Sequence, residues 1–275
     1  MEDITYKYIP IERISYLKDE LLRITQPGDL NDPFECRPVK LSIEEIHSLF
    51  NAFTTQQIEA INKMKISKDR RSELKNLLVR KFKSEKTKIL KNESGNFRDK
   101  FDSDAYAKLN SKIGILSLSK RWDSILMWAH YTDAHKGLCI GFDSNEPFFK
   151  NFKSIASESK IFLPVIYADE RTRIPIEQGK SIDSKVMLTK AKYWEYEQEE
   201  RLLVSFNEAS KKINAKPFDI YLYKVPHGLI REIIAGANIS KEFLDEVTKF
   251  CNEKTIKLFR SAISETEFSM IRDLV

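Results

Sequence analysis

The sequence predicts an α+β protein with a mixed, largely antiparallel sheet, flanking helices and a helical insertion. Short apolar runs bounded by turns, such as residues 113–119, recur along the chain and are typical of strands. From about residue 41 to 110 the apolar residues instead recur at helical spacing. The chain contains neither a GxGxxG motif nor a Walker loop, so a doubly wound nucleotide-binding fold is not indicated. We therefore expect the 275 residues to form a single domain of this class.

The N-terminal part is expected to hold short elements and one irregular loop. Residues 6–9 predict a strand, residues 11–22 a helix and residues 23–25 another strand. Residues 26–35 contain two prolines, a glycine and an Asn-Asp-Pro step, all of which disfavour regular structure. This stretch is therefore predicted to be an ordered or functional loop.

The helical insertion begins with a capping-box pattern, Ser42 followed by Glu45. Apolar residues then recur at helical spacing, which predicts helix to about residue 90 with one or two breaks. Residues 63–100 hold 14 Lys and Arg against 5 Asp and Glu, although the whole chain carries only +5. Two interpretations of this basic block remain open: an ordinary solvated helix surface, as is common for lysine-rich helices, or a surface that binds nucleic acid.

The remaining elements follow from apolar runs and capping residues. A helix over residues 122–131 is expected to start at Asp123 or Ser124, and an amphipathic helix to start near Ser240. A further helix is expected over residues 185–193. The other strands are predicted at residues 113–119, 137–142, 162–167, 194–204, 219–225, 230–235 and 256–259.

Cysteine use and apolar run lengths predict a cytoplasmic protein that does not enter a membrane. Cys36, Cys139 and Cys251 are widely spaced and form no CxxC pair, so neither a disulfide framework nor a zinc ribbon is indicated. The N-terminus lacks a basic region followed by an apolar stretch, and no run approaches the roughly 20 apolar residues of a spanning helix.

The most informative segment is the predicted strand at residues 194–204, where charged and apolar residues abut. Alternate residues of a strand share a face, so Glu197, Glu199 and Arg201 are expected to lie on one side. The preceding aromatic residues, beginning with Trp194, argue against a fully solvated face. Two interpretations remain open: a functional acidic pair, or a charged sheet margin paired with the arginine.

A second cluster follows the strand that ends at Ser119. The next helix carries Trp128, His130 and Tyr131, which would bring hydrogen-bonding and stacking groups to one sheet edge and form a pocket wall. A lone histidine among apolar residues is more often a satisfied core group than a base, so both interpretations of His130 stay open. Lys136 directly precedes a glycine and is expected in a turn, where it could meet an anion.

Other familiar sites are not indicated. The chain lacks HExxH, a cysteine cluster and a GxSxG elbow, so no zinc site or serine hydrolase is predicted. A metal-dependent nuclease remains an alternative, since Mg²⁺ needs only one or two carboxylates besides phosphate oxygens. The carboxylates available for it are those of Asp32, Glu35, Glu197 and Glu199.

Several motifs together resemble the domain-of-unknown-function family 2971, a bacterial family. The most specific are an Asn-Asp-Pro-Phe-Glu loop, a Trp-x-His-Tyr helix and a Tyr-Glu-x-Glu-x-Arg strand. They correspond to residues 31–35, 128–131 and 196–201, accompanied by residues 22–25, 116–119, 135–137 and Phe142.

The order of the elements is also similar to that of ADP-ribosyltransferases, especially the DNA-modifying toxins. That resemblance implies that NAD binds and that Glu199, with Glu197 beside it, contacts the nicotinamide-side ribose. The sequence offers Tyr-Lys-Tyr at residues 6–8 where that family has His-x-Thr or Arg. By analogy, Glu199, Glu197 and His130 form the catalytic set. The implied substrate-binding set is Tyr8, Arg23, Asn31, Asp32, Phe34, Ser119, Trp128, Tyr131, Lys136 and Arg201.

The roles implied by this second resemblance are specific. Trp128 or Tyr131 would stack on nicotinamide, and Ser119 and His130 would orient the ribose. Lys7, Arg23 or Lys136 would pair with the pyrophosphate. We therefore expect an ADP-ribosyltransferase-like enzyme that uses NAD and modifies nucleic acid in a phage-defence or toxin setting. The alternatives are the metal-dependent nuclease and a non-catalytic module that binds nucleic acid or protein.

Overall fold

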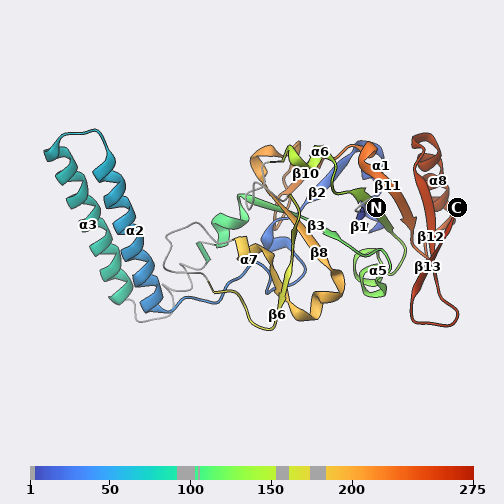
Figure 1. Cartoon of the computed structure of the whole chain (residues 1–275), viewed down its shortest axis with the longest axis horizontal. Coiled ribbons are helices and arrows are strands. Elements are labelled where there is room, and N and C mark those ends of the chain that lie inside the picture. The colour runs from blue at the N-terminus through green and yellow to red at the C-terminus, as the bar shows by residue number, and fades with distance from the viewer. Residues whose placement is uncertain (1–3, 92–102, 105, 153–160, 174–183) are drawn as a thin grey trace. The chain divides into compact units, whose positions relative to one another are not determined.

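The computed structural model describes residues 4–91, 103–104, 106–152, 161–173 and 184–275. The chain divides into two compact units (Figure 1). Unit 1 comprises Met1–Glu35, Asn110–Asp169 and Leu188–Val275, and unit 2 comprises Cys36–Leu109 and Glu170–Met187. The predicted α+β class is confirmed by the eight-stranded, mostly antiparallel sheet of unit 1 and the helices around it.

The main sheet of unit 1 has the strand order β13-β12-β11-β4-β1-β3-β8-β5. Every neighbouring pair is antiparallel except β11 and β12, which are parallel. The strands are β1 Ile4–Ile9, β3 Ile113–Ser119, β4 Leu138–Asp143, β5 Leu163–Pro164, β8 Glu199–Ser205, β11 Ile230–Ala235, β12 Lys257–Ile263 and β13 Met270–Leu274.

Two small sheets and several short helices complete unit 1. One small sheet has the order β2-β10-β9, and the other pairs β6 with β7. Their strands are β2 Leu21–Ile24, β6 Ile166–Ala168, β7 Thr189–Ala191, β9 Lys211–Ile213 and β10 Ile220–Lys224. The α-helices are α1 Tyr16–Asp19, α5 Ile125–Tyr131, α6 Pro147–Lys150 and α8 Lys241–Lys254. The 3-10 helices are η1 Ile11–Arg13, η2 Pro27–Asp29, η4 Lys192–Glu197, η5 Phe206–Glu208 and η6 His227–Leu229.

Alternation along the central strands sends apolar side chains to both faces of the main sheet. Leu116 of β3, Leu202 of β8 and Val247 of α8 belong to the larger core cluster. Tyr8 of β1 and Trp128 of α5 belong to a smaller cluster that includes Tyr6, Cys139 and Ile234. Ser119, the last residue of β3, pairs with Glu199, the first residue of β8. These two polar residues belong to neither apolar cluster.

The main sheet is incompletely paired between β1 and β3. Strand β1 pairs with β4 at six register positions, from Ile4↔Asp143 to Ile9↔Leu138. By contrast, β1 pairs with β3 only at Tyr6↔Ser119. Since a ladder forms only where two strands run side by side, β1 and β3 separate beyond this position. Their separation places the candidate site within the sheet.

Two predicted helices of unit 1 are wrong in part. Residues 11–22 form η1, α1 and the first residues of β2, because Glu20 adopts a left-handed conformation with φ 58° and ends the helix. Residues 185–193 form only the end of α7 (Ser184–Leu188), followed by β7 and the start of η4. In both segments the apolar pattern is too short to distinguish one helix from several short elements.

Two strand predictions also need correction. The strand expected over residues 194–204 begins only at Glu199, because η4 occupies residues 192–197. Residues 162–167 are split between β5 and β6. In addition, β13 was not predicted, although it forms one edge of the main sheet.

The predicted helical block forms most of unit 2. Helices α2 (Ile43–Lys63) and α3 (Lys68–Lys91) lie side by side (Figure 1). The capping box is confirmed, since Ser42 Oγ accepts the Glu45 N–H and the Glu45 carboxylate accepts the Ser42 N–H. Phe82 of α3 packs against Phe50 and Phe53 of α2, with ring centroids 6.0 and 5.6 Å apart. Residues 92–102 of the predicted block lie outside the described residues.

In the part of the chain that the structure describes, no helix combines the length and apolarity needed to cross a lipid bilayer.

Candidate functional site

Unit 1 contains a cavity of about 480 Å³ where β1 and β3 separate. Its lining comes from β1, β2, β3, α5, β7 and β8 together with the loop that ends at Glu35. This volume lies in the range of small-molecule sites, which is roughly 300–1,000 Å³. The lining carries many ionisable side chains, so its chemistry depends on how those charges are arranged.

A sharp backbone turn brings the two predicted glutamates into this cavity. Glu197 is the last residue of η4, and Glu199 is the first residue of β8. Gln198, between them, is left-handed with φ 44°, and its N–H donates to the Glu195 carbonyl. The two carboxylates therefore converge through a kink, and not through the alternation of a continuous strand that the sequence suggested.

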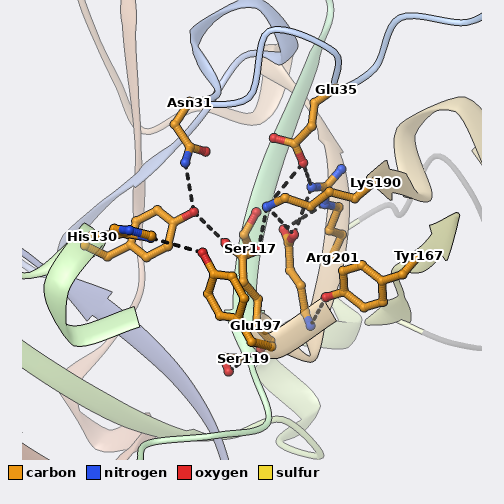
Figure 2. A network of polar contacts seen from close by, with 12 residues as sticks. Asn31, Glu35, Ser117, Ser119, His130, Tyr167, Lys190, Glu197 and Arg201 are labelled. Carbon is orange, nitrogen blue, oxygen red and sulfur yellow. Dashed lines mark hydrogen bonds and ion pairs between the residues drawn. The ribbon is translucent and has the colours of Figure 1, made fainter. Parts of the chain in front are cut away.

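Lys190 lies at the centre of the charged network (Figure 2). Its ammonium is within ion-pair distance of three carboxylates: it donates to Glu197 Oε2, lies 3.2 Å from Glu199 Oε2 and lies 3.4 Å from Glu35 Oε1. Arg201 completes the network from β8. Its Nε donates to Glu199 Oε1 at 2.7 Å, and its Nη2 donates to Glu199 Oε2 at 2.9 Å and also to Glu35.

All five members of this network are buried, with exposed fractions between 0% for Arg201 and 6% for Glu199. Buried charges are costly unless they are paired and hydrogen-bonded. Three carboxylates face two cations here, so the network carries one excess negative charge when every group is ionised. The second oxygen of Glu35, Oε2, is buried and has no hydrogen-bond partner among the described residues.

The two neighbouring glutamates differ in proton affinity. Burial opposes ionisation of Glu199, but Arg201 and Lys190 outweigh it and hold the pKa of this carboxyl far below its usual range. Burial raises the pKa of Glu197 above its ordinary value, against the opposing effect of Lys190. The cavity thus presents one fixed carboxylate beside one carboxyl with increased proton affinity, a combination typical of sites for acid–base chemistry.

A chain of polar aromatic groups extends from Glu197. The Tyr131 hydroxyl donates to Glu197 Oε1 at 2.6 Å and accepts from the Asn31 amide at 3.0 Å. Next to it, His130 Nδ1 lies 3.0 Å from the Tyr196 hydroxyl. Figure 2 shows Asn31 and His130 on the opposite side of the network from Arg201. Asn31 and His130 are exposed, so this part of the site is accessible from solvent.

Most residues predicted for the site come together in the cavity lining. They are Tyr8, Arg23, Asn31, Ser119, His130, Tyr131, Glu197, Glu199 and Arg201. The hydroxyl groups of two of them, Tyr8 and Ser119, already form hydrogen bonds with backbone groups. The Tyr8 hydroxyl donates to the Arg121 carbonyl at 2.9 Å, and Ser119 Oγ lies 2.6 Å from the Glu197 carbonyl and accepts from the Arg121 N–H.

Trp128 does not line the cavity, so its predicted role of stacking on a substrate needs correction. Its exposed fraction is 0%, its indole N–H donates to the Trp122 carbonyl, and its ring packs edge-on against Tyr8 at 5.3 Å. Although residues three apart share a helix face, only Tyr131 lines the cavity, because the Trp128 ring is buried against Tyr8.

Three other predicted residues also lie outside the cavity lining. Lys136 follows a left-handed turn at residues 133–135, which leaves it exposed and paired with Asp133 at 3.1 Å. Phe34 is 62% exposed. Asp32 is buried and accepts the Phe34 N–H at 2.8 Å, so it stabilises its own loop.

Sequence reasoning missed the central residue of the site. Lys190 sits in a segment expected to be helical, and no motif distinguishes it from the other lysines of the chain. Ser117 of β3 was also missed; its side chain hydrogen-bonds to Glu199. Glu35 was considered only as a metal ligand, but the structure pairs it with Lys190 and Arg201.

The contacts of Lys190 involve the carboxylates that the nuclease alternative assigned to a metal ion. Asp32, the fourth carboxylate, is not in the cavity lining. Among the residues that the structure describes, no three or more His, Cys, Asp or Glu side chains are grouped as metal ligands. The carboxylates of Glu35, Glu197 and Glu199 are thus paired with protein cations.

Residues 127–202 match the model of a family described as a protein of unknown function, DUF2971. The match confirms the first predicted resemblance over this segment, which carries α5, Lys190 and both glutamates of the cavity. No match is found among curated proteins or among solved structures. The resemblance to ADP-ribosyltransferases stays a prediction.

Proposed function

We propose that unit 1 is an ADP-ribosyltransferase-like enzyme that breaks the nicotinamide glycosidic bond of NAD in this cavity. The observation that carries the proposal is the pair of buried carboxyl groups, Glu197 and Glu199, whose environments move their pKa values in opposite directions. Their position beside Tyr131 and His130, in a cavity of about 480 Å³, supports it further.

The two glutamates suit different steps of this reaction. When the bond between the anomeric carbon and the nicotinamide nitrogen breaks, its electron pair leaves with neutral nicotinamide and positive charge develops on the ribose. A fixed carboxylate such as Glu199 stabilises that charge more in the transition state than in the ground state. The anomeric carbon then bonds to a nucleophilic atom of the acceptor, whose proton passes to a carboxylate. Glu197, with the higher proton affinity, suits this second role.

Glu199→Gln is expected to lower nicotinamide release by about 10²–10³-fold, because it removes the negative charge that faces the developing cation. The measurement is chromatography of nicotinamide after incubation with labelled NAD and mixed nucleic acids. Glu200→Gln is the matched control: Glu200 neighbours Glu199 in β8, pairs with Lys120 at 2.9 Å and does not line the cavity. Release within a few-fold of wild type is expected for this control.

The folded fraction of each variant is followed by thermal unfolding. If Glu199→Gln does not fold, Tyr131→Phe provides the second test, because it removes a hydroxyl that contacts Glu197 and changes no charge. Absence of nicotinamide release by the wild type with every acceptor would contradict the proposal. Equal release by Glu199→Gln and by the wild type would contradict the role of Glu199.

For the acceptor, we propose nucleic acid bound by unit 2. The supporting observation is the excess of exposed cations along the end of α2 and along α3. They are Lys63, Lys65, Lys68, Arg70, Arg80, Lys81 and Lys83, whereas the exposed acids from 63 to 83 are Asp69 and Glu73. A surface of this kind attracts phosphate backbones, with an affinity that falls as salt concentration rises.

Replacing Lys68, Arg80 and Lys83 by glutamine is expected to weaken binding to duplex DNA. If each side chain neutralises one phosphate, the slope of log affinity against log salt should become shallower by about 0.9 for each of them. Fluorescence anisotropy at several salt concentrations measures both effects. The matched control replaces three exposed lysines of α8, namely Lys241, Lys249 and Lys254. Equal slopes for the two triple variants would contradict this acceptor surface.

A further inference from the structure

The cavity of unit 1 contains a second set of cations that form no ion pair with the Lys190 network, although Glu199 and Glu197 of that network favour the charged form of one of them, Lys7. Lys7 of β1, Arg13 of η1 and Arg23 of β2 all line the cavity. These three residues precede the segment 127–202 that matches the family, so the match does not account for them. Three cations around one cavity repel each other, which is unfavourable unless anions lie nearby.

Lys7 reaches into the space left where β1 and β3 separate. Its ammonium donates to the Ser117 carbonyl at 2.9 Å and forms no ion pair with a described residue. An ammonium has three N–H groups, so two more remain for a ligand. Burial, followed by the positive charge of Arg13, lowers the pKa of Lys7 to about 8. The protonated form of Lys7 thus lacks the carboxylate partner that Lys190 has.

The two arginines are also incompletely neutralised. The Arg13 side chain is exposed and has neither a hydrogen bond nor an ion pair with the described residues, and the acidic group that acts on it is its neighbour Glu12. Arg23 pairs with Asp29 through Nη2, but its Nε is buried and has no hydrogen-bond partner among the described residues. Leaving a buried donor unpaired costs free energy. An anion in the cavity would satisfy this donor and screen the repulsion of Lys7 and Arg13.

We propose that Lys7, Arg13 and Arg23 form an anion subsite that takes the pyrophosphate group of a nucleotide. Guanidinium and ammonium groups are the usual protein partners of phosphate oxygens. The inference deepens the proposed function, on which the identity of the nucleotide as NAD rests. Arg13 takes the role that the sequence suggested for Lys136, which does not line the cavity.

The test measures binding of inorganic pyrophosphate and of ADP to the full chain by isothermal titration calorimetry at fixed ionic strength. Arg13→Gln is expected to weaken both at least tenfold, because Arg13 has no structural partner to disturb. Lys18→Gln is the matched control, since Lys18 is exposed, pairs with Glu246 and lies outside the cavity lining. This control is expected to bind like the wild type.

Pyrophosphate affinity is also expected to fall between pH 7 and pH 9, because Lys7 loses its charge around pH 8. Lys7→Met should bind weakly and lose this pH dependence. The other charged or titratable groups that line the cavity come from several elements. They are Tyr6, Tyr8, Glu12, Arg13, Arg23, Asp29, Glu35, His130, Tyr131, Asp133, Lys190, Glu197, Glu199 and Arg201.

The inference is overturned if pyrophosphate does not bind the wild type, or if Arg13→Gln and Lys7→Met both bind it as the wild type does. It is also overturned if a short DNA oligonucleotide competes for the subsite more strongly than ADP, because the ligand would then be a nucleic-acid backbone. Specific pyrophosphate binding without nicotinamide release supports the subsite and contradicts the proposed function. Nicotinamide release with unchanged KM for NAD in Arg13→Gln contradicts the subsite alone.

Discussion

Lys190→Met is expected to destabilise unit 1 by about 3–5 kcal/mol at neutral pH, the cost of removing one partner from a buried ion network. The ammonium is 3.2 Å from Glu199 and 3.4 Å from Glu35, and it also donates to Glu197. Without it, Arg201 would still pair with Glu199 and Glu35, but Glu197 would lose its ion-pair partner. Methionine matches the length of the lysine stem, so the loss of charge, and not of packing volume, dominates the effect.

This loss of stability is expected to shrink as the pH falls towards 5. In the wild type the pKa of Glu199 is held below its unfolded value, so its contribution is present above about pH 4.3 and is lost as the pH falls. In the variant, the buried carboxyls of Glu197 and Glu199 lose the ammonium that favours their ionised forms, so their pKa values should lie above those in the unfolded chain. Their folded state then binds more protons than the unfolded state, and the stability of the variant falls as pH rises. The difference between the two proteins is therefore largest near neutral pH.

Urea unfolding at pH 5, 6, 7 and 8 measures both the size and the pH dependence. Lys18→Met is the control, because Lys18 forms an exposed pair with Glu246 and such pairs contribute about 0–1 kcal/mol. A Lys190→Met variant that is as stable as this control, or whose stability changes between pH 5 and pH 8 in parallel with that of the wild type, would show that the three carboxylates do not depend on the ammonium.

Arg201→Met is expected to have a comparable effect, again about 3–5 kcal/mol. The guanidinium is fully buried, at 0% exposure, and donates to Glu199 and Glu35. The Arg201 backbone is held on both sides, because β8 pairs with β3 and with β5 at this position. Removal of the guanidinium would leave Glu35 and part of Glu199 buried without their strongest hydrogen-bond donor.

Differential scanning calorimetry compares Arg201→Met with Arg260→Met, whose guanidinium is exposed on β12. A surface substitution of this kind usually changes stability by less than about 0.5 kcal/mol. Adding Glu35→Gln to Arg201→Met should recover part of the loss, since it removes one of the two carboxylates that lost the guanidinium, and the double-mutant cycle isolates that coupling. Equal melting temperatures for Arg201→Met and Arg260→Met would contradict the buried network.

The burial of this network has a functional consequence if the proposed reaction is correct. A carboxylate held by two cations cannot reorient freely, so Glu199 is preorganised to face a developing positive charge. The same contacts make Glu199 a structural residue, so thermal unfolding of Glu199→Gln must accompany its activity measurement. Tyr131, which touches Glu197 but carries no charge, separates the two contributions more cleanly.

Local patterns predicted the regular elements well where apolar spacing was long and capping was explicit. The helices α2, α3 and α8 and the strands β3, β4 and β11 agree with the sequence. The helices follow a helical apolar spacing, and the three strands are short apolar runs that are buried on both faces. Where elements are three to five residues long, as from α7 through η4, the spacing does not distinguish helix from strand. The errors in the predicted helices and strands are concentrated in such segments.

The sequence by itself determined the α+β class and the helical block, and it named Glu197, Glu199, Arg201 and Tyr131 as candidate site residues, since these follow from local periodicity and from charged residues next to apolar ones. Only the tertiary structure decided which side chains meet. It placed Lys190 between three carboxylates, opened the cavity between β1 and β3, and buried Trp128 in the core. These contacts join residues far apart in the chain, and a buried charge reveals its partners only once the strands that carry them are paired.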